Sequence, residues 1–294
     1  MANIQLITDC GCDLPLNFLD NHNITLIPLK VHLGEDEFED LVTIEPKTVY
    51  DAMRNGASPK TSQASPNTMQ EIFTELAQAK QPAIYFAFSS ELSGTYSTAC
   101  MIRDQVREEY PDLDLTIIDT KCASLGMGLV VKHAAELLKN GADKETIVAE
   151  CEFMARHMEH LFTVDKLDYL QRGGRISKTS AVVGGLLNIK PLLNVEDGKL
   201  VPLEKIRGDK KLMKRMLELI GERGVDLENQ VIGISHADSE EVALKYKELL
   251  AEKYGCKHFM INTIGAAIGA HAGPGTIAIF FLNAQMNTSL PVQQ

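Results

Sequence analysis

The stretch AIYFAFSSELSGTYST, Ala83–Thr98, decides the fold of this chain. Its first six residues form an apolar run, which is typical of a strand buried on both faces of a sheet. The hydroxyl-rich segment SSELSGTY follows, and a helix is predicted from about Ser93 to Glu109. A buried strand that passes through a short loop into a helix is the repeating unit of a parallel sheet covered by helices.

The same alternation continues on both sides of this stretch. Upstream, Ile4–Thr8 and Ile24–Leu33 are predicted strands, and Ser65–Pro66 is the capped start of an amphipathic helix. Downstream, Leu113–Asp119 is a predicted strand and Ser124–Lys139 a predicted helix. The pattern predicts a mostly parallel sheet flanked by helices.

The second half of the chain repeats the α/β pattern after a new strand at His160–Val164. Ala181–Leu187 is a predicted helix of small residues. Ile189–Val195 and Lys199–Lys205 are expected to pair across Asp197–Gly198, a dipeptide typical of a two-residue hairpin turn. The predicted organisation is an N-terminal α/β domain (1–160), a C-terminal α/β domain (161–283) and a polar tail (284–294).

Composition excludes several classes of protein. The 294 residues are 45% hydrophobic and carry a net charge of −11, so a nucleic-acid partner is not expected, because phosphate binding needs a basic surface. No apolar run is long enough for a transmembrane segment. Met1–Leu6 has neither a basic region nor a long apolar region typical of a secretion signal, and we expect a cytoplasmic protein.

The six cysteines do not form a recognisable metal motif. Cys10 and Cys12 make a C-x-C pair, but neither a second pair nor a His doublet lies nearby in the sequence. We therefore expect free thiols, with neither a metal nor another cofactor.

Three segments carry the chemistry that the sequence offers. SPKTSQASP (Ser58–Pro66) and SSELSGTYST (Ser89–Thr98) are hydroxyl-rich loops that lead into helices, and IGAAIGAHAGPG (Ile264–Gly275) holds one His among Gly and Ala. Together they offer backbone N–H groups, hydroxyls and an imidazole to an oxygen-rich ligand head. We interpret them first as a binding site and second as a catalytic one.

Two other patterns are weaker. Gly126-Met-Gly128 follows a strand, but the third glycine of a dinucleotide fingerprint is replaced by Val131, so a packing helix is favoured. Gly233-Ile-Ser235-His236-Ala237 resembles a nucleophile elbow, but the next helix begins too late for the strained turn of that motif.

The order of several motifs resembles the DegV family of bacterial fatty-acid-binding proteins, of which some members are the acyl-carrying subunit of a fatty acid kinase. The resemblance covers Ile4 to Asn283. Its motifs, in order, are ITD at the end of the first strand, SPKTSQ, SSELSGTY, IDTKCASLGMGL, LDYLQRGGRIS, LLNIKPLL and IGAAIGAHAGPGT.

The resemblance implies a two-domain DegV-like fold that holds one fatty acid between its domains, with the acyl chain in an internal apolar tunnel. Carried over position by position, the carboxylate-binding residues are Thr61, Ser93 and His271. Their expected supporting neighbours are Ser62, Gly94 and Thr95. Such a set is physically reasonable, because a buried carboxylate needs several converging donors; alternatively, the hydroxyls are helix caps and His271 an interior histidine.

The resemblance also implies a partner. Arg172, Arg175 and Arg207 are expected to face an ATP-dependent fatty acid kinase or the phosphate of an acyl-phosphate. ATP and magnesium would belong to that partner, since this chain has no nucleotide fingerprint. The family commonly has Ser where this chain has Cys10, and a thiol is a weaker donor.

For the tunnel we expect apolar residues from both domains, namely Phe86, Phe88, Met127, Ile189, Leu192, Ile264 and Ile268. A substrate carrier without its own catalysis is the favoured function. One alternative is a serine esterase or acyltransferase with Ser93 as nucleophile and His271 as base. Another is a lipid sensor that needs no kinase.

Overall fold

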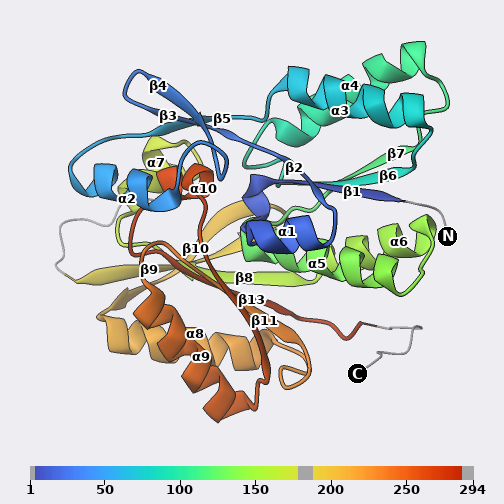
Figure 1. Cartoon of the computed structure of the whole chain (residues 1–294). Helices are drawn as coiled ribbons and strands as arrows, with labels where there is room; N and C mark the ends of the chain where they lie inside the picture. Colours follow the sequence, from blue (N-terminus) through green and yellow to red (C-terminus); the bar gives the residue numbers. More distant parts are fainter. Residues whose placement is uncertain (1–3, 178–187, 287–294) are drawn as a thin grey trace.

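A four-stranded parallel sheet organises the first half of the chain, in the order β2-β1-β6-β7 (Figure 1). The computed structural model describes residues 4–177 and 188–286. The parallel pairing of these four strands confirms the predicted parallel sheet. Its strands are β1 (Gln5–Asp9), β2 (Thr25–Ile27), β6 (Ala83–Ala87) and β7 (Leu115–Asp119).

Helices cover both faces of this sheet (Figure 1). Alternate residues of β1 and β6 point to opposite sides: Ile7 and Tyr85 pack with α3 and α4, whereas Leu6 and Phe86 pack with α5 and α6. The helices of this half, with one 3-10 turn, are η1 (Cys10–Cys12), α1 (Leu16–Asn21), α2 (Pro46–Arg54), α3 (Pro66–Ala79), α4 (Thr95–Glu109), α5 (Leu125–Lys139) and α6 (Lys144–Arg156).

The prediction of one strand over Ile24–Leu33 is wrong. The segment divides at Pro28, which has no N–H to donate to a sheet. After β2, the chain enters a small antiparallel sheet of order β4-β3-β5, made of β3 (Lys30–Leu33), β4 (Asp36–Glu39) and β5 (Lys60–Ser62). The strand β5 lies inside the segment that we predicted to be a loop, and it pairs Thr61 with Val31.

A six-stranded sheet organises the second half, in the order β10-β9-β8-β13-β11-β12. Its neighbouring strands are antiparallel except for the parallel pair β11–β12. The predicted hairpin is confirmed, with positive φ at both Asp197 and Gly198. The strands are β8 (Met158–Thr163), β9 (Ile189–Glu196), β10 (Lys199–Arg207), β11 (Val231–His236), β12 (His258–Thr263) and β13 (Ile277–Leu282).

The two large sheets share the helix α5. On one face of the six-stranded sheet, α8 and α9 close a separate core. On its other face, a continuous core includes Leu6 of β1, Val130 of α5 and Phe280 of β13. The remaining helices are α7 (Leu167–Arg172), α8 (Asp209–Arg223), α9 (Glu240–Tyr254) and α10 (Ala266–Ala272).

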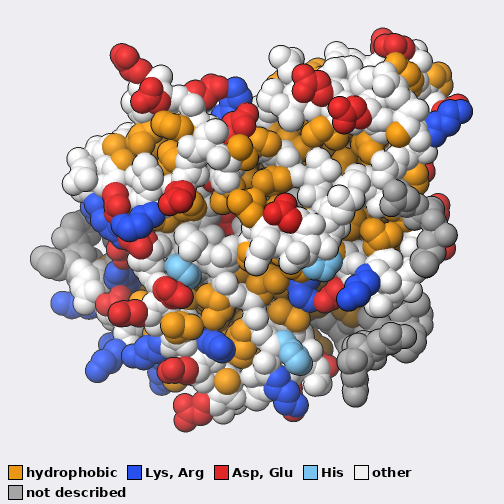
Figure 2. All heavy atoms as spheres, in the orientation of Figure 1, with side chains coloured by type: hydrophobic (Ala, Val, Ile, Leu, Met, Phe, Trp, Pro, Cys, Tyr) orange, Lys and Arg blue, Asp and Glu red, His pale blue; other side chains and the backbone are white. Residues whose placement is uncertain are grey.

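On the face shown in Figure 2, acidic and basic side chains are interspersed. None of the helices in the described ranges combines the length and the apolar content that crossing a bilayer requires. The predicted helix Ala181–Leu187 and the tail from residue 287 onward lie outside the described residues.

The glycines of α5 permit the close approach of its neighbours. A Cβ atom on Gly128 would lie 2.5 Å from the carbonyl oxygen of Cys12, and one on Gly126 would collide with the His160 ring. All residues from Leu125 to Val131 are buried. The interpretation of Gly126 and Gly128 as packing positions is confirmed.

We predict that Gly128→Ala destabilises the protein. In an exposed helix this change stabilises by roughly 0.5–1 kcal/mol, but here the added methyl group meets a backbone carbonyl that cannot move freely. The expected loss in the free energy of unfolding is about 1–3 kcal/mol, measured by urea denaturation. A variant as stable as the wild type would contradict the close approach of α5 to η1.

Candidate functional site

A cavity lies between the two halves of the chain and is lined by residues of both. Its volume is about 180 Å³ for the centre of a water-sized sphere. This volume is many times the roughly 10–15 Å³ that a single water molecule needs. Much of its wall is apolar and includes Leu29, Phe88, Leu92, Phe162, Val195 and Phe280.

Three of the seven expected tunnel residues line the cavity, and the other four do not. Phe88, Ile264 and Ile268 line the cavity. Phe86 and Met127 lie in the core around α5. Leu192 is on the opposite side of β9, in the core under α8. Ile189, the first residue of β9, is also absent from the lining.

Five of the six predicted head-group residues line the cavity, namely Thr61, Ser62, Ser93, Gly94 and His271. Thr61 is presented by β5 and His271 by α10, and their Oγ1 and Nε2 atoms are 2.6 Å apart. Ser93 and Gly94 come from the loop just before α4.

Thr95, the sixth predicted residue, is buried behind this wall. Its Oγ1 accepts a hydrogen bond from the backbone N–H of Ala64 at 3.3 Å and lies 2.9 Å from Ser93 Oγ. Thr95 therefore joins the segment after β5 to the loop that carries Ser93. Its role in the structure is to support these two loops.

The His271 imidazole is neutral at physiological pH. Burial, with a further contribution from the charge of Arg175, lowers the pKa of His271 from 6.5 to about 4. A neutral ring has one N–H to donate. The ring also packs tightly on Gly173 of the QRGGR segment, where a Cβ atom would overlap it.

The three arginines occupy different environments. Arg175 lines the cavity, donates from Nε to the Leu92 carbonyl at 3.1 Å, and has a pKa lowered by burial. Arg172 is exposed, with its guanidinium over the ring of Tyr169. Arg207 is exposed at the end of β10. Only Arg175, among these three, is part of the cavity wall.

Sequence reasoning missed several polar residues of the wall. Gln63, the last residue of the SPKTSQ motif, lines the cavity beside Gly94, and its Nε2 donates to Thr98 Oγ1 at 2.7 Å. Its place in the motif was the available signal. His160 also lines the cavity, but its two ring nitrogens are engaged by the Met158 carbonyl and the Ala123 N–H.

The geometry does not assemble a serine nucleophile with its base. Ser93 Oγ interacts with Thr95, and His271 Nε2 interacts with Thr61. Within residues 4–177 and 188–286, no hydrogen bond joins Ser93 to His271. Ser235, from the elbow-like sequence, is a buried residue of β11 whose Oγ is 2.7 Å from Ser124 Oγ.

The cysteines are free thiols throughout the described part of the chain, where no cluster of His, Cys, Asp and Glu could hold a metal ion. Cys10 is not part of the cavity wall. Its Sγ accepts from the Leu29 N–H at 3.1 Å, and burial raises the pKa of the thiol.

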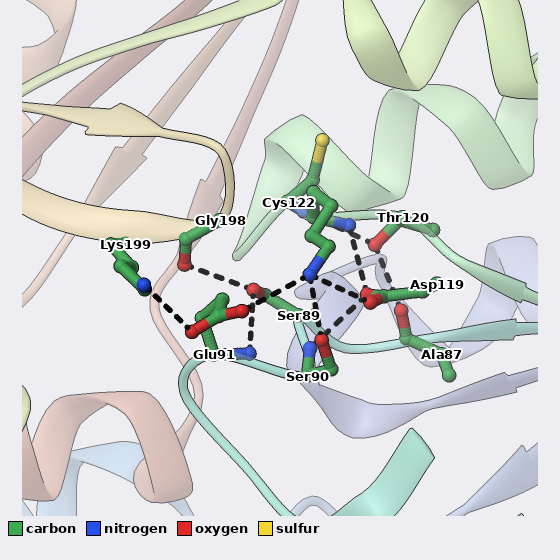
Figure 3. A network of polar contacts seen from close by, with 10 residues as sticks. Ala87, Ser89, Ser90, Glu91, Asp119, Thr120, Cys122, Gly198 and Lys199 are labelled. Atoms are coloured by element: carbon green, nitrogen blue, oxygen red, sulfur yellow. Dashed lines mark hydrogen bonds and ion pairs between the residues drawn. The ribbon is translucent and has the colours of Figure 1, made fainter. Parts of the chain in front are cut away.

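A network of polar contacts holds the β9–β10 hairpin against the first half of the chain (Figure 3). Ser89 Oγ donates to the Gly198 carbonyl at 2.9 Å. Lys199 of the hairpin pairs with Glu91 at 3.4 Å, and Glu91 also pairs with Lys121 at 3.3 Å. Because Val195 and Leu200 flank the hairpin turn and line the cavity, this network also fixes one wall of the cavity.

A second polar contact between the halves is made by the buried side chain of Asp13. Asp13 Oδ1 accepts from the Gly265 N–H at 2.8 Å, and Oδ2 is hydrogen-bonded to Ser124 Oγ. Burial raises the pKa of Asp13 from 3.8 to about 8, despite these hydrogen bonds. Asp13 is therefore mostly protonated at neutral pH.

We predict that Asp13 weakens the fold as pH rises. Between pH 4 and 8 the folded protein retains a proton on Asp13 that the unfolded chain releases, so stability is lost with increasing pH. The difference in unfolding free energy between wild type and Asp13→Asn should shift in favour of the variant, by at most about 1.4 kcal/mol per pH unit. Urea denaturation at pH 5, 7 and 9 measures it, and a constant difference would contradict the prediction.

Comparison with known proteins supplies a family. The sequence profile described as "Uncharacterised protein, DegV family" matches residues 3–284. A DegV domain-containing protein of Clostridium perfringens is 40% identical over 285 residues, which are 96% of this chain and 98% of that protein. Protein DegV of Bacillus subtilis is 35% identical over 282 residues, 94% of this chain and 98% of that protein.

Solved structures share the fold. A DegV family protein from Thermus thermophilus, whose structure describes fatty acid binding, has a TM-score of 0.87 and 31% identity, covering 96% of this chain and 99% of that one. DegV from Bacillus subtilis, described as a fatty acid binding protein, has a TM-score of 0.84 and 32% identity, covering 97% and 100%. The α/β fold predicted from the motifs is confirmed.

Proposed function

This chain belongs to the DegV family, and we propose that it binds one long-chain fatty acid in the cavity between its two halves. The acyl chain occupies the apolar part of the cavity. The carboxylate meets Thr61, Ser93 and His271, supported by Ser62 and by the backbone of Gly94. The solved DegV structures described as fatty acid binding support the ligand class.

The observation that carries the proposal is the composition of the cavity wall. Apolar side chains from both halves surround a space of about 180 Å³. Hydroxyls, an imidazole and a guanidinium also line this space, and Thr61 and His271 are in direct contact. An amphiphile with one anionic head matches both parts of the wall.

The acyl chain provides most of the binding free energy. Each buried methylene contributes about 0.8 kcal/mol, so a dozen contribute on the order of 10 kcal/mol before the cost of association. The polar residues then have a different role, which is to compensate the carboxylate for the water that it loses. They select the head group rather than create the affinity.

Arg175 belongs in this site as its source of positive charge. Because His271 is neutral when no ligand is bound, hydroxyls and a neutral ring offer hydrogen bonds without a net charge. The Arg175 guanidinium lines the same cavity and, held by the Leu92 carbonyl, neutralises the carboxylate. The sequence led us to expect that Arg175 faces a phosphate or a partner. We propose instead that it binds the carboxylate of the fatty acid.

We predict that Thr61→Ala, Ser93→Ala and His271→Ala each weaken fatty-acid binding by about 1–3 kcal/mol, as expected for a lost hydrogen bond to a charged group. Isothermal titration with palmitic acid and with 1-hexadecanol separates head from chain. The alcohol, which carries no charge, should lose much less. Equal losses for both ligands, or wild-type binding of the acid by all three variants, would refute the proposed head-group site.

The ligand's carboxylate is proposed to be presented to an ATP-dependent fatty acid kinase, which forms the acyl-phosphate. ATP and magnesium bind to the kinase, and this chain acts as the substrate carrier. Arg172 and Arg207 support this role by their exposure, because charged groups on an accessible surface steer a partner of opposite charge.

Charge reversal distinguishes docking from ligand binding. Arg172→Glu should slow phosphorylation of bound fatty acid by a fatty acid kinase while palmitate affinity stays within twofold. Arg175→Glu should lower both, because it places a carboxylate beside the ligand's carboxylate. Kinase assays and titrations on the same samples measure the two effects. Loss of palmitate binding in Arg172→Glu would contradict the separation.

A further inference from the structure

The helix α10, which carries His271, is anchored by side chains from the other half of the chain. In Figure 1, α10 lies beside α2, although some 200 residues separate them along the chain. Tyr50 of α2 donates from its hydroxyl to the Ile264 carbonyl at 2.5 Å. Asp13 accepts from the Gly265 N–H at 2.8 Å.

Asp40 makes the next two contacts along the chain. This buried side chain follows β4, and its two carboxylate oxygens accept from the Ala266 N–H at 2.8 Å and the Ala267 N–H at 2.9 Å. Four consecutive backbone groups, from Ile264 to Ala267, are therefore held by the first half of the chain.

These contacts lie about one helical turn before His271. His271 is four residues after Ala267, and residues four apart lie on the same side of a helix, about 6 Å apart along its axis. Near the end of this short helix, the ring contacts Thr61 and packs on Gly173. A shift at Ala266 and Ala267 consequently moves the ring.

We infer that Asp40 is a positioning residue for the ligand's head group. Asp40 belongs to the first half of the chain and fixes the start of α10, which belongs to the second half. It thereby orients the His271 ring toward the carboxylate. The inference rests on the proposed function.

Asp40→Asn is the most direct test. Both oxygens of Asp40 accept from N–H groups, and an amide offers one acceptor and directs its own N–H₂ at the second donor. In the full-length protein, palmitic acid should bind roughly tenfold more weakly, and 1-hexadecanol should change by about twofold or less. The side-chain NMR signals of His271 should shift, whereas those of His160 should not.

Asp143→Asn serves as the matched control. Asp143 also accepts a backbone N–H at the start of a helix, from Thr146 at 2.8 Å, but that helix is α6 and lies outside the cavity wall. This variant should bind palmitic acid as the wild type does. If Asp40→Asn does not fold, Tyr50→Phe removes the neighbouring hydrogen bond, keeps the ring, and should show the same preference in a weaker form.

Two results would overturn the inference. One is an equal loss of acid and alcohol binding in Asp40→Asn, which shows a general structural role. The other is unchanged palmitate affinity with unchanged His271 signals. If the wild type itself binds no fatty acid, the proposed function fails, and the His271 signals of the ligand-free variants still decide whether Asp40 positions the ring.

Discussion

The candidate site depends on one set of hydrogen bonds, which joins the backbone of residues 264–267 to Tyr50, Asp13 and Asp40. They fix the start of α10, whose Ala266, Ala267 and Ala270 also pack in an apolar core of the first half. At the other end of the helix, His271 contacts Thr61 in the cavity wall. Burying carboxylates for this purpose is costly, as the raised pKa values of Asp13 and Asp40 show. Backbone donors that would otherwise be unsatisfied offset part of this cost.

Local patterns predict the elements of this fold well, because they reflect local physics. The apolar run at Ala83–Phe88 and the dipeptide Asp197–Gly198 gave a buried strand and a hairpin turn, both of which the structure contains. The error at Ile24–Leu33 has a local cause too: Pro28 interrupts a hydrogen-bonded strand, and the two pieces join different sheets. The site residues Thr61, Ser93 and His271 were named from motifs, and their common cavity follows from the fold.

The contacts between the halves could not be predicted in the same way. Nothing in the sequence near Asp40 indicates that it accepts from Ala266 and Ala267, more than 200 residues later. Likewise, Arg172 and Arg175 are three residues apart in one motif, yet one is exposed over Tyr169 and the other lines the cavity. Sequence periodicity reports which residues are buried, whereas pairing across a tertiary contact is decided by the topology of the sheets.

A lipid carried between the two halves is the central claim, and its most direct test is chemical. The protein is purified from a bacterial host, denatured and extracted with organic solvent, and the extract is examined by mass spectrometry. The account predicts one fatty acid per chain, in a length that the cavity admits. An extract without fatty acid, from protein that also fails to take up added palmitic acid, would contradict it.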